Sequence, residues 1–295
     1  MKKVFFTDRK HVSYRIIKDK VITGIFIILS LTVTIPLFMI LYDLFSKGYS
    51  QINFDFFTET TPNAILAIKA KAEGSVIPGG VANGIVGSFI IIGIASLLAI
   101  PIGVVTGTYL SELKSDKFSG FVRTVVEMLQ GVPSIVLGII GYIWIVKPIT
   151  KGFSGFAAAV ALSIMMLPSI IRTTEETLNM ISPSLKEAAF SLGVPYWRVV
   201  LKVIIPNGFS GIITGIMLGI SRIAGETAPL LLTALGSLVV TYDPTKPMSA
   251  LPLMVWEFYN DPNLVDMIWS ASLLLIILVL VLNIAAKILS AKLKN

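Results

Sequence analysis

Long runs of apolar residues, separated by short polar stretches, dominate the chain. Six of these runs have about the 20 residues that a helix needs to cross the hydrocarbon core of a membrane. They lie at residues 21–45, 85–110, 125–147, 154–172, 203–225 and 268–290. The pattern predicts six transmembrane helices and therefore an all-α polytopic membrane protein.

Composition supports this reading and removes several functions. Of the 295 residues, 55% are apolar and only 14% are charged, whereas soluble domains carry about 25% charged residues. We therefore expect no large soluble domain. The chain has no cysteine and a single histidine, His11, which excludes thiol catalysis and leaves too few ligands for a Cys- or His-based metal site. We expect no metal, no cofactor and no catalytic residue.

Lysine and arginine residues are distributed unevenly between the loops. Seven precede the first span, three lie near 114–123, four near 172–202 and three after residue 286, against six in the other three loops together. Positive charge concentrates on the cytoplasmic side, so both termini are predicted to be cytoplasmic. The basic tail resembles a signal peptide, but the long run after it lacks a small-residue cleavage site. It should remain as an uncleaved anchor.

This topology divides the chain into a few parts. They are a cytoplasmic tail 1–20, a first anchor 21–45, an extracytoplasmic segment 46–84, a core 85–290 with a cytoplasmic loop 173–202, and a cytoplasmic tail 291–295. The net charge of +7 is explained by basic loops beside membrane lipid. We therefore expect no nucleic-acid binding.

Two further features concern the spans and one outer loop. Pro101, Pro133 and Pro168 interrupt apolar runs and predict kinks, which bundles tolerate where neighbours satisfy the freed carbonyls. The loop 241–267 carries Asp243, Glu257, Asp261 and Asp266 against one lysine. An acidic rim would repel anions, so no substrate role is assigned to it.

The cytoplasmic loop 173–202 contains a predicted helix with two start signals. Ser184 with Glu187 three residues later has the pattern of a capping box, and Ser182 before Pro183 is a competing N-cap. Small and apolar side chains follow: Ala188, Ala189 and Gly193 beside Leu185, Phe190 and Leu192. This surface suits a short helix that inserts into a groove of another protein. An ordinary surface helix between two spans is the alternative.

The second candidate site lies near the outer end of the fifth span. Arg222 and Glu226 are four residues apart, so on one helix they would share a face. An arginine at span depth costs about 2.5–3.5 kcal/mol on insertion scales and usually faces a bundle interior or a watery path. Gly211, Gly215 and Gly219 form a stripe for close helix packing. A guanidinium matches an oxyanion through forked donors; a static salt bridge is the alternative.

The loop motif resembles a known family. Glu187-Ala188-Ala189, Gly193 four residues later and an Ile205-Pro206 end are similar to the EAA loop of ABC importer permeases. The resemblance runs from about residue 84 to 287 and includes the segments 83–88, 101–104 and 131–136. It implies a type I importer permease with a MetI-like bundle. It also implies that Glu187, Ala188, Ala189 and Gly193 dock as a coupling helix on an ATP-binding subunit.

The segment 222–231, RIAGETAPLL, resembles the signature of phosphate importer permeases of the PstA type. The resemblance implies that Arg222, Glu226 and Thr227 line the anion path. It implies a heterodimer with a sister permease, two copies of an ATP-binding subunit and an extracytoplasmic phosphate-binding protein, in a bacterial cytoplasmic membrane. Sulfate, molybdate and phosphonate permeases share the EAA loop and are the alternatives.

Two other classes of protein explain the sequence less well. A secondary transporter would leave the 30-residue loop without a function, and the halves show no inverted repeat. A membrane enzyme would need a nucleophile, a metal set or a histidine partner near Arg222. The chain has no G-x-x-x-x-G-K-[ST] motif and so does not hydrolyse ATP itself. Motion of partner ATPases is expected to reach the path through the coupling helix and the fourth and fifth spans.

Overall fold

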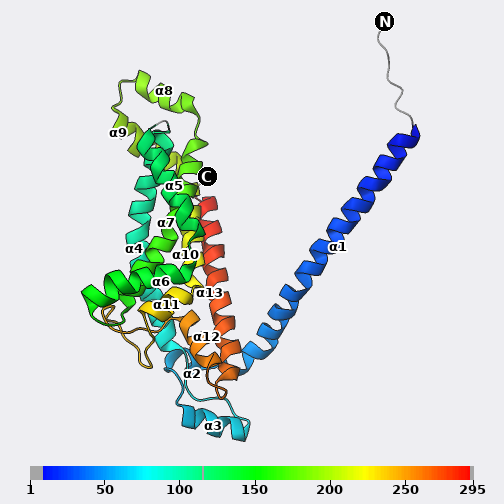
Figure 1. The fold of residues 1–295 in the computed structure, drawn as a ribbon, viewed down its shortest axis with the longest axis vertical. Coiled ribbons are helices and arrows are strands. Elements are labelled where there is room, and N and C mark those ends of the chain that lie inside the picture. The colour runs from blue at the N-terminus through cyan, green and yellow to red at the C-terminus, as the bar shows by residue number, and fades with distance from the viewer. Residues whose placement is uncertain (1–8, 115, 293–295) are drawn as a thin grey trace. The chain divides into compact units, whose positions relative to one another are not determined.

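The computed structural model describes residues 9–114 and 116–292, which form helices joined mostly by short connections, with a longer one at residues 234–250 (Figure 1). The chain forms two compact units, residues 1–47 and 48–295. Its elements are α1 (Arg9–Gly48), η1 (Tyr49–Gln51), α2 (Phe54–Thr58), α3 (Ala64–Glu73), α4 (Ala82–Glu112), α5 (Lys117–Gly131), α6 (Ser134–Gly141), η2 (Tyr142–Thr150), α7 (Gly155–Asn179), α8 (Pro183–Ser191), α9 (Tyr196–Val199), η3 (Val200–Ile204), α10 (Ile205–Ala224), α11 (Ala228–Thr233), α12 (Leu251–Tyr259) and α13 (Val265–Lys292). The η1 turn is 3₁₀, and η2 and η3 are π-helical.

The first unit is the long apolar helix α1. Side chains such as Phe26, Val33 and Phe38 are exposed, and no residue of its most apolar window is buried. A helix that is hydrophobic all round is suited to lipid rather than to water. The predicted span 21–45 lies within this helix, which continues in both directions. Residues 1–8 of the predicted tail lie outside the described residues.

The second unit is a bundle centred on α7. In α7, 67% of the most apolar window is buried, against 33% for α4. Glycines let α4 and α10 approach α7 closely, because a Cβ at Gly107 would overlap Thr174 and one at Gly215 would overlap Thr173. Gly211 and Gly219 also face α7. The glycine stripe on the fifth span therefore packs as predicted.

The third apolar run is not one straight span. Helices α5 and α6 are separated by Val132 and Pro133, and the segments 117–131 and 134–150 are bent by 104° relative to each other. Proline disfavours helical backbone in the residue before it, and Val132 is extended, with φ −70° and ψ 127°. The kink predicted at Pro133 is therefore confirmed, and it divides the predicted span 125–147 between two helical segments. Pro101 and Pro168, by contrast, lie inside α4 and α7.

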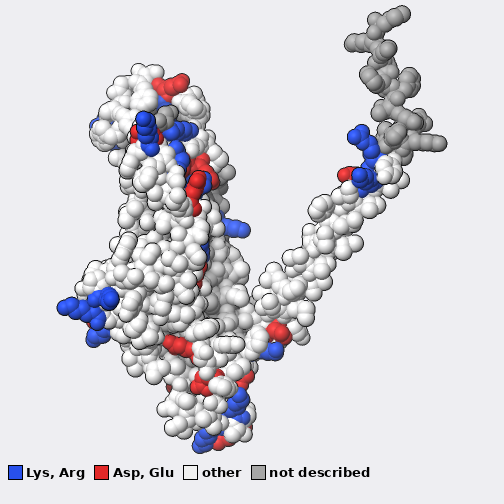
Figure 2. All heavy atoms as spheres, in the orientation of Figure 1, with Lys and Arg blue, Asp and Glu red and all other residues white. Residues whose placement is uncertain are grey.

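The described helices satisfy the length and apolarity of membrane spans. Five are long and apolar enough to cross a membrane, and the total is six if the bent pair counts as one span. On the bundle of residues 48–295, charged side chains gather mainly at the two ends, and the surface between them is largely uncharged (Figure 2). The chain is therefore a multi-pass membrane protein.

The two ends of this bundle carry different elements. Helices α2 and α3 lie at one end, and α8 and α9 lie at the other (Figure 1). The predicted segments 46–84 and 173–202 are thus separated by the length of the bundle. At the C-terminus, α13 extends to Lys292, so part of the predicted tail 291–295 is helical. Residues 293–295 lie outside the described residues.

Candidate functional site

The predicted cytoplasmic helix forms as α8, with its start set by proline. Ser182 is the N-cap residue, and Pro183 lies in the first turn, where the fixed φ of proline favours a helix start. Neither Ser182 nor Ser184 caps a backbone N–H; their hydroxyl oxygens lie 2.7 Å apart. The proposed capping box of Ser184 and Glu187 was therefore wrong, because the helix begins before Ser184.

Gly193 ends the α8 segment with a left-handed backbone. Its φ is 73°, a region that residues with a Cβ occupy at a cost. The N–H of Gly193 donates to the carbonyl of Phe190, and the N–H of Val194 donates to the carbonyl of Ala189. This pair of hydrogen bonds is a Schellman cap. Gly193 thus has a structural role that the sequence analysis did not assign to it.

The residues of the EAA motif differ in their surroundings. Glu187, Ala188 and Gly193 are exposed, and their side chains or Cα atoms face open space. Ala189 is partly buried and packs against a small core cluster that includes Leu178. The motif therefore has an outward surface of Glu187, Ala188 and Gly193, and Ala189 holds the helix onto the bundle.

The outward segment is also attached to α4 through a carboxylate that the sequence analysis missed. Glu112, the last residue of α4, forms an ion pair with Lys186 of α8. Its other oxygen accepts a hydrogen bond from the hydroxyl of Tyr196 at 3.1 Å. The rings of Phe190 and Tyr196 stack at 6.2 Å. Partners 74 and 84 residues away in sequence give no local signal, so spacing alone could not have identified Glu112.

A second charged cluster joins three helices near the same end of the bundle. Nε of Arg123 on α5 donates to Glu175 of α7 at 2.7 Å, and Nη2 of Arg123 donates to the carbonyl of Leu110 on α4 at 2.7 Å. Glu175 has only 11% of its side chain exposed. Arg123 thus satisfies a buried carboxylate and one of the last carbonyls of α4.

Arg222 and Glu226 are near one another in the chain but do not lie on one helix. Helix α10 ends at Ala224, Gly225 follows as its C-cap, and α11 begins at Ala228. Glycine weakens a helix, and Pro229 is favoured in a first turn, so the chain turns between them. The prediction of a shared helix face was wrong. No ion pair joins the two side chains within the described part of the chain.

The three predicted path residues have different exposure. Arg222 is exposed, whereas Glu226 and Thr227 are partly buried. All three lie at the end of α10 that is remote from α8 and α9 (Figure 1). Thr227 borders a cavity of about 400 Å³ whose other walls come from α12 and α13: Pro252, Val255, Trp256, Tyr259 and Ile268.

Helix α10 exposes polar side chains that the middle of α13 lacks. Asn207, Thr214 and Arg222 are exposed along α10, together with Pro206, Phe209 and Leu218. Between residues 276 and 285 of α13 the exposed side chains are all apolar, among them Ile276, Leu280 and Ile284. Lipid suits this part of α13 and disfavours an exposed arginine. The part of α10 around Arg222 is therefore suited to water, an ion or another protein.

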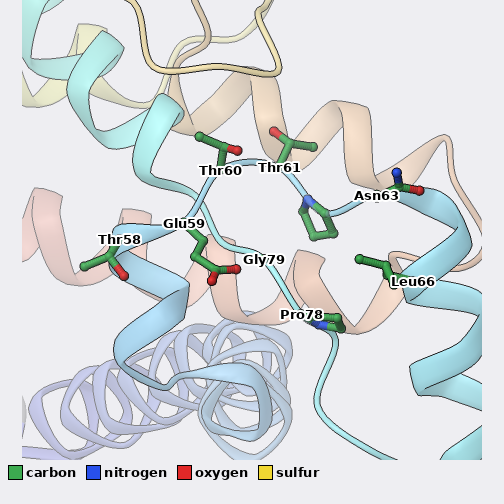
Figure 3. A pocket seen from close by; sticks show the side chains of 9 residues that line it. Thr58, Glu59, Thr60, Thr61, Asn63, Leu66, Pro78 and Gly79 are labelled. Carbon is green, nitrogen blue, oxygen red and sulfur yellow. The ribbon is translucent and has the colours of Figure 1, made fainter.

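Another cavity, of about 390 Å³, lies at the end of the bundle that carries α2 and α3. Figure 3 shows Glu59 and Leu66 on opposite sides of this hollow, with Thr60 and Thr61 on the loop between α2 and α3. Thr61 also accepts a hydrogen bond from the Asn83 amide. The loop is thereby fastened to the first turn of α4.

Glu257 is a half-buried carboxylate on α12 that sequence reasoning treated only as part of an acidic rim. Burial raises the pKa of Glu257 to about 7. Its Oε1 lies against the Cα of Gly236, where a Cβ would overlap it; Gly236 has φ 91°. Near neutral pH, a substantial fraction of the molecules hold this group uncharged, so the rim is less negative than the sequence suggests.

Membrane-length helices around α7, an exposed arginine on α10 and a helical loop at one end define a multi-pass membrane protein. Residues 99–295 match the family described as "Binding-protein-dependent transport system inner membrane component". The fold is similar to that of the inward-facing MetNI methionine ABC transporter, with a TM-score of 0.62 at 19% identity, covering 72% of this chain and 95% of that chain.

Relatives narrow the family further. The "Phosphate transport system permease protein PstA" of Pasteurella multocida (strain Pm70) is 37% identical and covers 84% of this chain and 86% of its own length. The PstA of Yersinia pestis is 37% identical and covers 90% of this chain and 88% of its own length. PstA 1 of Mycobacterium tuberculosis (strain ATCC 25618 / H37Rv) is 33% identical and covers 92% of this chain and 87% of its own length. The chain belongs to the family of PstA-type ABC importer permeases.

Proposed function

We propose that this chain is the permease subunit of an ATP-driven inorganic phosphate importer and that the side of α10 with Asn207, Thr214 and Arg222 forms its half of the translocation path. The observation that carries the proposal is the exposure of three polar side chains, Asn207, Thr214 and Arg222, on a membrane-length helix. Its other exposed residues from 205 to 224 are Pro206, Phe209 and Leu218, whereas residues 276–285 of α13 expose only apolar side chains. A membrane helix with an exposed arginine needs a watery path or a partner beside it. The relatives named above are phosphate permeases.

The anion contact is assigned to Arg222, with Glu226 and Thr227 beside it. Arg222 is exposed and has no carboxylate within ion-pair distance among the described residues, so its fork of donors is available to an oxyanion. Thr227 supplies a hydroxyl, which hydrogen-bonds without adding charge. Glu226, as an acceptor-only carboxylate near the path, disfavours prolonged binding of the anion and so favours its release.

The remaining parts of the transporter follow from the family. A sister permease completes the path, an extracytoplasmic binding protein delivers phosphate, and two ATP-binding subunits hydrolyse ATP for the complex. Glu187, Ala188, Ala189 and Gly193 form the docking region for one ATP-binding subunit. We place the protein in the cytoplasmic membrane with both termini inside, on the strength of the basic residues at both ends of the chain.

The path assignment is tested by changing Arg222 and Glu226 together, Arg222→Met with Glu226→Leu. Binding-protein-dependent phosphate uptake should fall by about ten- to a hundredfold, the size of one lost charge-assisted contact. Membrane abundance and co-purification of the ATP-binding subunit should not change. The matched control Lys147→Met removes an exposed positive charge from η2 and should leave uptake intact.

Near-normal uptake in the double variant would remove the anion-path role. If the two charges only neutralise each other in the assembled complex, each single change should be harmful and the double change should restore function, because the cost comes from the uncompensated charge. Competition with sulfate and molybdate in the same assay identifies the oxyanion. Uptake blocked equally by sulfate would contradict phosphate as the substrate.

A further inference from the structure

The ion pair between α4 and α8 has a position that no part of the proposed function uses. Glu112 is the C-terminal residue of α4, and Lys186 lies on the helix that carries the EAA motif. The side chain of Glu112 is 8% exposed and that of Lys186 is 23% exposed. A pair so shielded from water is stronger and more geometrically constrained than a surface pair.

Helix α8 lies at the surface of the bundle. None of its residues is fully buried. Besides its chain connections, it contacts the bundle through partly buried Ala189 and through the Lys186–Glu112 pair. Tyr196 on α9 binds the second oxygen of the same carboxylate. One carboxylate therefore links both short helices of the loop to the end of α4.

The opposite end of α4 is fastened to a different part of the bundle. Nδ2 of Asn83 donates to the carbonyl of Ser237 at 2.6 Å, and Ser88 accepts a hydrogen bond from the N–H of Leu251 at 2.8 Å. A Cβ at Gly87 would overlap the carbonyl of Ser249. The segment 237–251, which leads into α12 and follows the predicted path residues, is thus held directly by the first turns of α4.

Helix α4 is a continuous element between these two attachments. It has 31 residues and is about 46 Å long at 1.5 Å per residue. It also packs along the buried helix α7, through Gly103 and Gly107. A displacement of α8 that carries Glu112 with it would move α4 along its contacts and shift the segment 237–251.

We infer that Glu112 is a positioning residue that links α8 and α9 to α4, so that motion of the coupling helix reaches the far end of the bundle through α4. This inference rests on the proposed function of α8. Helices α7 and α10 flank the loop 173–202 in sequence and are the two routes already expected. Helix α4 is then a third route. Removal of the link should separate ATP hydrolysis from transport without preventing assembly.

The first experiment measures the ratio of phosphate transported to ATP hydrolysed by the full complex in liposomes. Glu112→Gln and Lys186→Gln should each lower the ratio by about tenfold, within the usual range of coupling energies. The exchange Glu112→Lys with Lys186→Glu should restore at least part of it. The matched control exchanges the exposed pair of Arg172 and Glu127, 3.0 Å apart, and should leave the ratio unchanged.

The second experiment reports the link without any transported substrate. The chain lacks cysteine, so cysteines at Ser184 on α8 and Val105 on α4 can carry spin labels at two defined sites. In the wild-type complex, the distance between the labels should stay the same with and without ATP, because α4 follows α8. In Glu112→Gln it should differ between the two states.

The outcomes separate the inference from the function on which it rests. An unchanged transport ratio in both single variants, or a label distance that is independent of ATP in Glu112→Gln, overturns the role of Glu112. Loss of the ratio without any recovery in the charge exchange also contradicts it, because a link by charge pairing should be reversible. If Glu112→Gln does not assemble, Lys186→Gln and the exchange decide. A wild-type complex that moves no phosphate contradicts the proposed substrate, while the label experiment still tests the link.

Discussion

Glu257 lies where an ionised group is costly. It is half buried on α12, and within the described residues no hydrogen bond or ion pair joins its carboxylate to a partner. Its carboxylate meets the backbone of Gly236 instead of a cation. The free-energy cost of burying its charge is the whole cause of its raised pKa.

This raised pKa predicts a dependence of stability on pH. Because the folded pKa of Glu257 is about 7, against an ordinary value of 4.5, the folded protein binds more protons than the unfolded chain between these values. The free energy of unfolding should therefore fall as pH rises from 4.5 to 7. Glu257→Gln lacks this loss, so its melting temperature in detergent should exceed the wild-type value at pH 8 and approach it at pH 5.

A matched control separates Glu257 from carboxylates in general. Glu73 on α3 has 59% of its side chain exposed, and Glu73→Gln should follow the wild-type melting curve at every pH. A difference between Glu257→Gln and the wild type that is the same at pH 5 and pH 8 would contradict the assignment of the pKa shift.

At the scale of the elements, glycines decide which helices approach closely. Helix α7 is contacted by glycine-bearing faces of both α4 and α10. Not every glycine has this function: a Cβ at Gly93 on α4 would meet nothing within 4 Å. The same residue type in the same kind of helix therefore has opposite consequences for stability.

The pair Gly215→Ala and Gly93→Ala tests this difference. A Cβ at Gly215 would overlap both the hydroxyl and the Cβ of Thr173, so Gly215→Ala should lower stability by about 1–3 kcal/mol through overpacking. Gly93→Ala should raise it by about 0.5–1 kcal/mol, because alanine loses less backbone entropy in a helix. Denaturant titration in mixed micelles measures both changes. Equal effects of the two substitutions would contradict the close approach of α10 to α7.

At the scale of the whole molecule, the two ends of the bundle are chemically and topologically distinct. The α8–α9 end carries the EAA motif, and the α2–α3 end carries the long segment before α4 (Figure 1). If the helices between them cross the membrane, these two ends face opposite compartments. The count of basic residues predicts that the α8–α9 end faces the cytoplasm.

Single cysteines test this topology. Ser75 and Ser184 are both exposed, and the absence of native cysteine makes each substitution the sole reactive thiol. In intact cells, a membrane-impermeant reagent should label Ser75→Cys and leave Ser184→Cys unlabelled until the membrane is opened. Labelling of Ser184→Cys in intact cells would reverse the predicted orientation.

The sequence by itself determined the features that depend on local pattern. Apolar runs long enough to cross a bilayer predicted the helical membrane fold, because lipid leaves the backbone no other partner than itself. Ser182 and Pro183 carried a local start signal for α8. The ten residues from Arg222 were enough to indicate the family that the comparisons establish.

Only the tertiary structure decided how distant residues meet. Glu112 pairs with Lys186 across 74 residues, and half-buried Glu257 lies against Gly236. Neither contact leaves a periodic signal, because each depends on how separate segments pack. The 104° bend before α6 also depended on more than local chemistry, since Pro101 and Pro168 lie within helices while the chain breaks at Pro133. Local chemistry permits a break, and the surrounding helices determine whether it occurs.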